Sequence, residues 1–184
     1  MSTNSPNPYQ HKIITIPNLI SLFRLLLIPL FAWLYMKGEY AWTVAVLGIS
    51  GLSDIADGII ARKCNMTSDL GKVLDPVADK LTQFVMMLCL LTRFPSMRTP
   101  LIVLIVREIT NALTGAMVIR KTGMVLGAEW HGKAATVMIY IMMLTHVIWY
   151  SIPVNVSGLL CTLATLMIII SLVLYTRRNV EAAG

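Results

Sequence analysis

Apolar residues gather in six stretches of about 20 residues each, which is the length that an α-helix needs to cross a bilayer. Short polar segments separate them at residues 37–40, 62–72, 93–100, 120–133 and 151–157. The pattern therefore predicts an all-α, polytopic membrane protein. Its six transmembrane helices are expected at residues 19–36, 41–62, 74–93, 99–119, 133–151 and 156–175.

The polar start of the chain precedes the first of these helices. It lacks the apolar core and cleavage site of a signal peptide. We expect residues 1–18 to form a short cytoplasmic or interfacial segment, with Pro17 and Asn18 opening the first transmembrane helix. The alternative is an ordinary helix start without an interfacial role.

Composition supports this membrane assignment. The chain is 57% hydrophobic with a mean hydropathy of +0.74, and only 13% of its residues are charged, against about 25% in a soluble domain. Its 184 residues suit a single domain, 1–184. The three cysteines form no closely spaced pair, so neither a zinc site nor a disulfide framework is indicated.

The formal net charge of +6 comes from cations at the ends of apolar stretches. No basic stripe interleaved with aromatic residues is present, so a nucleic-acid partner is not expected. By the positive-inside rule we expect both termini and the 62–72 and 120–133 loops in the cytoplasm. That side holds Lys12, Arg62, Lys63, Lys72, Arg120, Lys121, Lys133, Arg177 and Arg178, against Lys37, Arg93 and Arg98 opposite.

Acidic residues cluster where an apolar pattern should exclude them. Asp54 and Asp57 lie within one predicted span, and Asp75 and Asp79 open the next. A carboxylate at the centre of a bilayer costs at least about 2.5 kcal/mol, so such residues indicate function. Asp69 lies in the loop and is more simply explained as a solvated or capping residue.

Helical spacing brings these acids onto shared faces. Asp54, Asp57, Gly58 and Ala61 fall within an arc of roughly 100°, and Gly71, Asp75 and Asp79 repeat every four residues. A short loop lets the two faces converge, and four hard oxygen ligands can bridge two divalent cations. The small residues admit a ligand, and Arg62 suits phosphate. A structural hydrogen-bonding role or close helix packing would be the alternative.

Pro76 leaves one local question open, because proline disfavours the α conformation in the residue before it. Either Asp75 caps a helix that begins at Pro76, or a helix that begins near Ser68 is bent there.

The residues from Asp54 to Asp79 read DIADGIIARKCNMTSDLGKVLDPVAD. Their spacing, D-x2-D-G-x2-A-R-x8-G-x3-D-x3-D, resembles the signature of the CDP-alcohol phosphatidyltransferase family at every fixed position. The resemblance extends to IPNLISLFRLLLIP, to Arg107 with Glu108, and to Gly132, Lys133 and Thr136. It covers nearly the whole chain and implies a bacterial cell-membrane enzyme whose active site faces the cytoplasm.

The resemblance also implies roles for individual residues. Asp54 and Asp75 would bridge two Mg²⁺ or Mn²⁺ ions, Asp57 would complete the first site and Asp79 the second, and Asp79 would act as general base. The CDP-lipid contacts would be Pro17, Asn18, Gly58, Ala61, Arg62, Ser68 and Gly71. The implied reaction transfers the phosphatidyl group of CDP-diacylglycerol to glycerol 3-phosphate and releases CMP.

A phosphorylated acceptor needs cations of its own, and Arg107, Lys133 and Arg120 are the candidates. Arg107 could instead form an internal ion pair with Glu108, and Arg120 could anchor its span at the headgroups. Glu129 and His131 depart from the smaller or neutral residues expected by resemblance. His131 is therefore either a pH-sensitive acceptor contact or an interfacial anchor beside Trp130.

Other functions stay open at this point. Relatives with the same motif use phosphatidylglycerol, inositol phosphate or serine as acceptor. A divalent-cation transporter is the alternative of a different class, but its site would usually lie near the bilayer midplane, whereas these acids lie towards one side. We also expect contact with membrane lipids and a homodimer.

Overall fold

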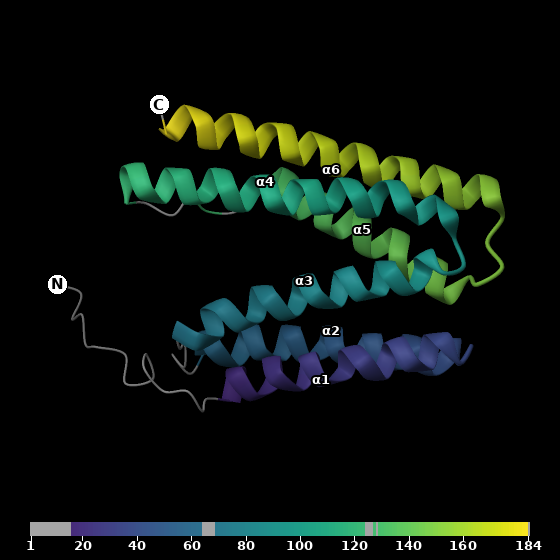
Figure 1. Ribbon diagram of the computed structural model, residues 1–184. Coiled ribbons are helices and arrows are strands. Elements are labelled where there is room, and N and C mark those ends of the chain that lie inside the picture. Colours follow the sequence, from purple (N-terminus) through teal and green to yellow (C-terminus); the bar gives the residue numbers. More distant parts are fainter. Residues whose placement is uncertain (1–15, 64–68, 124–126, 128, 184) are drawn as a thin grey trace. The chain divides into compact units, whose positions relative to one another are not determined.

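A computed structural model represents the chain. It describes the backbone of residues 16–63, 69–123, 127 and 129–183, and the side chains of residues 18–51, 53, 76–123, 127 and 129–183. Every regular element in this part of the chain is a helix (Figure 1), which confirms the all-α prediction there. The elements are α1 Ile16–Met36, α2 Tyr40–Lys63, α3 Asp69–Leu91, η1 Pro95–Met97, α4 Arg98–Thr122, α5 Trp130–Ile148 and α6 Val154–Ala183.

Each predicted apolar stretch corresponds to one long helix, but the ends differ. Helix α6 continues to Ala183 rather than residue 175, because polar residues can extend a helix; Arg177 and Glu181 pair at the i, i+4 spacing that stabilises exposed helices. Helix α3 begins at Asp69 and runs through Pro76. Of the two alternatives for this region, a helix that begins at Pro76 is therefore wrong.

In the part of the chain that the structure describes, four helices are long and apolar enough to cross a membrane by length and composition. They are Asn18–Met36, Pro95–Thr122, Trp130–Ile148 and Val154–Ala183. Within α2 only Tyr40–Gly51 forms a shorter apolar segment among the described residues. The membrane assignment stands on these four helices, and the spans predicted at 41–62 and 74–93 stay a prediction.

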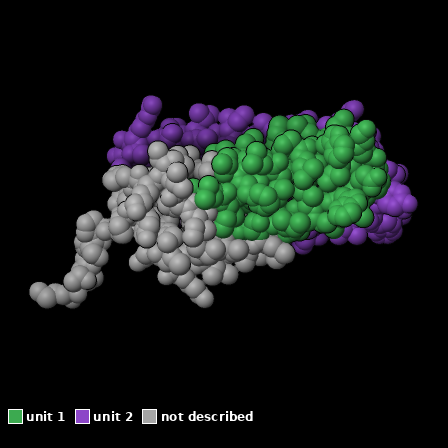
Figure 2. Space-filling view, turned by 90° about the horizontal axis from the view of Figure 1, so that it is seen from below, with its two compact units in different colours: residues 1–89 green, residues 90–184 purple. Residues whose placement is uncertain are grey.

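The chain divides into two compact units, residues 1–89 and 90–184, coloured separately in Figure 2. In the first unit, α1 packs against α2. The buried face of α1 is apolar in its second half, where Leu27, Phe31 and Tyr35 recur every four residues. This spacing places the three side chains on one face of α1.

In the second unit, α6 packs against both α4 and α5 (Figure 1). Met142, Met143 and Ile168 are fully buried there. His146 is also fully buried, and a hydrogen bond of 2.9 Å joins its Nε2 to the Ser157 hydroxyl. Helix α4 ends at Thr122 and is capped by Gly123, whose φ of 69° is a left-handed conformation that glycine adopts without strain.

Candidate functional site

From Asn18 to Arg24, the side chains that α1 buries are polar. Asn18, Ser21 and Arg24 are 5%, 0% and 2% exposed, and their spacing of three residues places them along one side of the helix. Polar groups buried in a membrane helix are costly unless they serve a partner or a ligand. The N-terminal half of α1 thus presents a polar face within the first unit.

Arg24 pairs with Asp79, the predicted general base. Its Nη1 donates to Asp79 Oδ1 at 2.5 Å, joining α1 to α3 across 55 positions of sequence. The Arg24 side chain is 3% exposed and that of Asp79 is 49% exposed. A buried cation therefore holds a carboxylate that a ligand can still reach.

Arg24 was not among the residues predicted from the sequence. A usable signal existed, because Arg24 is a charge within an apolar stretch, as Asp54 is. Its pairing with Asp79 depends on how α1 and α3 pack, which the local pattern does not contain.

Several predicted site residues lie outside the described side chains. The backbones of α2 and α3 include the positions of Asp54, Asp57 and Asp75, but the structure does not describe these side chains. The same holds for Pro17, Gly58, Ala61, Arg62 and Gly71, and Ser68 lies outside the described residues altogether. Among the side chains that are described, no three His, Cys, Asp or Glu groups are placed to hold a metal ion.

The three predicted acceptor cations all belong to the second unit. Arg107 is buried, and its Nη1 lies 3.4 Å from Glu108 Oε1, so the internal ion pair is present. Arg120 is exposed in the last turn of α4. Lys133 is exposed in the first turn of α5. Of the three cations, only Arg120 and Lys133 have exposed side chains.

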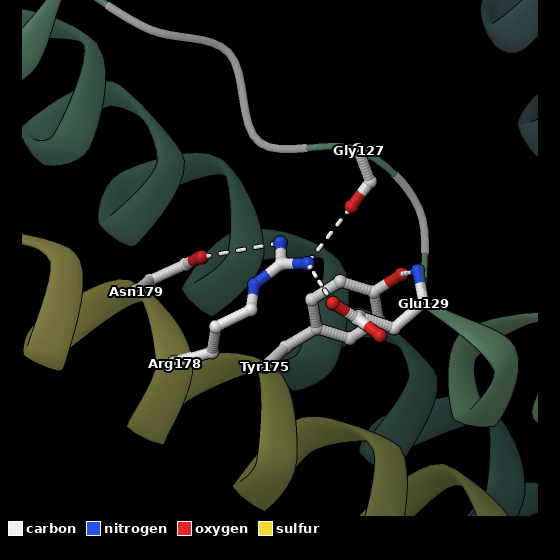
Figure 3. A network of polar contacts seen from close by, with 5 residues as sticks. All are labelled: Gly127, Glu129, Tyr175, Arg178 and Asn179. Carbon is white, nitrogen blue, oxygen red and sulfur yellow. Dashed lines mark hydrogen bonds and ion pairs between the residues drawn. The ribbon is translucent and has the colours of Figure 1, made fainter.

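A polar network joins the end of α6 to the segment before α5 (Figure 3). Arg178 Nη1 donates to the Gly127 carbonyl and to Glu129 Oε1, both at 2.8 Å. Its guanidinium lies over the Tyr175 ring, 4.9 Å from the centroid. The Glu129 backbone N–H donates to the Tyr175 hydroxyl at 2.8 Å. These contacts fix the position of Glu129, immediately before α5 begins.

The start of α5 also packs closely on Tyr175. A Cβ atom at Gly132 would lie 2.6 Å from the Tyr175 ring and hydroxyl, so the approach requires glycine. His131 is 6% exposed, and its ring packs edge-on against Tyr175 with centroids 4.6 Å apart. Glu129 and His131, which departed from the expected pattern, therefore both contact α6.

Comparison with known proteins identifies the family. The family model described as CDP-alcohol phosphatidyltransferase matches residues 14–177. The chain belongs to this family. The match spans both compact units, and CDP-alcohol phosphatidyltransferases use divalent metal ions.

Similar proteins include both a phosphatidyltransferase that is named for glycerol 3-phosphate and cardiolipin synthases. The chain is 30% identical over 170 residues to a CDP-diacylglycerol–glycerol-3-phosphate 3-phosphatidyltransferase of Aquifex aeolicus, covering 89% of this chain and 95% of that protein. It is 45% identical over 76 residues to a cardiolipin synthase (CMP-forming) of Streptomyces coelicolor, covering 38% of this chain. A human cardiolipin synthase (CMP-forming) is 38% identical over 79 residues. The matched stretches span only 35% and 26% of these two synthases.

Proposed function

We propose that this protein transfers a phosphatidyl group from CDP-diacylglycerol to glycerol 3-phosphate, forming phosphatidylglycerophosphate and releasing CMP. The observation that carries the proposal is the similarity to the Aquifex aeolicus transferase, which extends over nearly the full length of both chains. The complete acidic motif from Asp54 to Asp79 supports the same chemistry. This is metal-assisted phosphoryl transfer.

The proposed donor site belongs to α1, α2 and α3. Asp54, Asp57, Asp75 and Asp79 would hold two divalent ions, Mg²⁺ or Mn²⁺, because carboxylate oxygens are the ligands that these ions prefer. Asp79 suits this role in the described part of the site, since its carboxylate is half-exposed. The residues proposed to contact the CDP-lipid are Pro17, Asn18, Gly58, Ala61, Arg62, Ser68 and Gly71, and Asn18 lies on the buried polar face of α1.

In the proposed reaction, a side chain of the protein accepts one proton. The primary hydroxyl oxygen of glycerol 3-phosphate attacks the phosphorus that carries diacylglycerol, and the bond from that phosphorus to the oxygen of CMP breaks. Asp79 takes the hydroxyl proton, and Arg24 orients its carboxylate through the Nη1–Oδ1 hydrogen bond. Bound divalent ions would neutralise the pyrophosphate and the charge that develops on CMP.

The acceptor phosphate is assigned to cations of the second unit. Lys133 and Arg120 are exposed and can bind an anion without losing a partner among the described residues. Arg107 is the weaker candidate of the three, because Glu108 already neutralises it.

A second acceptor has a specific observation in its favour. The identity to the Streptomyces coelicolor cardiolipin synthase is higher, at 45%, although only over 76 residues. The same donor chemistry with phosphatidylglycerol as acceptor would give cardiolipin.

A CMP-release assay tests both reactions. The purified protein is supplied with CDP-diacylglycerol, a divalent ion and a panel of acceptors: glycerol 3-phosphate, phosphatidylglycerol, inositol phosphate and serine. We expect glycerol 3-phosphate to give the fastest release. No release with any acceptor would contradict the transferase function and revive cation transport, while faster release with phosphatidylglycerol would select the second reaction.

We also propose that the protein lies in a bacterial cell membrane, with six spans and both termini in the cytoplasm. It would form one domain over residues 1–184 and assemble as a homodimer. The excess of Lys and Arg in the predicted cytoplasmic loops supports the orientation. The single family match across residues 14–177 supports one domain.

A further inference from the structure

A cavity of about 160 Å³ lies between α4 and α6 in the second unit. Its lining residues belong to the C-terminal halves of both helices, whose ends we expect to face the cytoplasm. Among the described residues, those that line it come from α4 and α6: Asn111, Gly115, Val118, Ile119, Tyr175, Arg178 and Asn179. The volume exceeds what a single water requires.

The lining combines carbon surface with hydrogen-bonding groups. Val118, Ile119 and Tyr175 supply apolar surface, while Asn111, Arg178 and Asn179 supply amide and guanidinium groups. This combination of an apolar wall with a few polar groups is typical of sites for small organic ligands.

Hydrogen-bonding capacity remains at two of these side chains. Asn111 Oδ1 and Arg178 Nε are buried and have no hydrogen-bond partner among the described residues. One is an acceptor and the other a donor, which matches a ligand that carries hydroxyl groups. Both atoms are covered in this conformation, so a ligand reaches them only after a local shift of the two side chains that keeps the ion pair of Arg178 with Glu129.

The charges of the lining residues further limit the kind of ligand that the cavity can bind. The Arg178 guanidinium already pairs with Glu129 Oε1 at 2.8 Å (Figure 3). Asn179 is also engaged, donating to the Thr114 hydroxyl at 2.9 Å. The named lining groups therefore carry little uncompensated charge, and they favour neutral hydroxyls over a phosphate dianion.

We propose that this cavity binds the glycerol unit of the acceptor, with Asn111 and Arg178 contacting its hydroxyl groups. The inference rests on the proposed function and adds to it a site for the glycerol carbons and hydroxyls, separate from the cations assigned to phosphate. The glycerol unit has two possible sources, glycerol 3-phosphate or the headgroup of phosphatidylglycerol.

Gly115 allows the cavity to be filled with little risk to folding. A Cβ atom at this position meets no other atom within 4 Å, and leucine is a better helix former than glycine. Gly158 is the matched control, because it is also helical and also opens onto free space. It lines a different cavity, with Ser96 and Cys161. The variants are Gly115→Leu, Gly158→Leu and Asn111→Leu.

Steady-state kinetics of CMP release test the proposal in detergent micelles containing CDP-diacylglycerol. One arm varies glycerol 3-phosphate and the other varies phosphatidylglycerol. We expect Gly115→Leu and Asn111→Leu to raise the KM for the acceptor that the wild type uses by about tenfold, the effect of losing one good hydrogen bond or its space. The KM for CDP-diacylglycerol should stay within about twofold, and Gly158→Leu should match the wild type in both constants.

The arm in which the wild type is active identifies the source of the glycerol unit. An unchanged acceptor KM in Gly115→Leu and Asn111→Leu would overturn the cavity assignment while leaving the transferase function intact. A rise confined to the KM for CDP-diacylglycerol would overturn it too, because the cavity would then serve the donor. A wild type without CMP release in either arm would remove both this assignment and the two reactions proposed above.

Discussion

The pairing of Asp79 with Arg24 makes a quantitative prediction for Asp79→Asn. Asparagine keeps the shape of the side chain but loses the negative charge that accepts the hydrogen bond of Arg24 Nη1. A hydrogen bond to a charged group contributes about 1.5–3 kcal/mol. We expect the lower end of this range, because the Asp79 side chain is 49% exposed and solvent screens its charge.

The cost of this substitution should appear as lower stability together with lost activity. A loss of about 1.5 kcal/mol lowers the Tm of a domain of this size by roughly 3–6 °C. Transfer should be abolished even at temperatures where Asp79→Asn is fully folded, because the general base is absent. The assays are thermal unfolding of the purified protein in detergent and CMP release at a temperature well below both Tm values.

A double-mutant cycle with Arg24→Gln isolates the pair. Once Asp79 has been replaced, we expect Arg24→Gln to cost less than it does alone, because the interaction is then already lost. Arg24→Gln alone should keep the base and reduce kcat without abolishing transfer. Stability changes that add within about 0.5 kcal/mol would refute the coupling, and full transfer by Asp79→Asn would refute its role as base.

Three further predictions concern packing, a buried histidine and the metal ions. Gly132→Ala should destabilise the protein by about 1–3 kcal/mol, because its Cβ would lie 2.6 Å from the Tyr175 ring. Gly158→Ala, which meets no neighbour within 4 Å, is the control in the same unfolding assay, and equal Tm values would contradict the close packing. His146→Leu should lower the free energy of unfolding by about 1–3 kcal/mol, because it removes the hydrogen bonds that the His146 ring forms with the Met142 carbonyl and the Ser157 hydroxyl. An unchanged denaturation midpoint would exclude a stabilising role for His146. A chelator should stop CMP release and added Mg²⁺ or Mn²⁺ should restore it, whereas release that survives chelation would rule out metal dependence.

The amino-acid sequence by itself was sufficient for the helices and for the family. Each apolar stretch predicted one helix. This prediction was possible because a run of about 20 apolar residues is recognised from neighbouring positions in the sequence. The motif from Asp54 to Asp79 indicated the family through its resemblance to a known signature, and such a motif can be read along the chain without the tertiary structure. The sequence did not decide whether a helix begins at Pro76 or runs through it, since proline is compatible with both positions; the structure has the helix running through Pro76.

Only the tertiary structure decided which distant residues meet. Arg24 lies 55 positions from Asp79, and Arg178 lies 49 positions from Glu129, yet each forms an ion pair. From sequence, Arg24 was one residue of an apolar stretch and Arg178 one of several cytoplasmic cations. Hydropathy and helical period describe neighbours along a single helix, whereas these pairs depend on the packing of one helix against residues far along the chain.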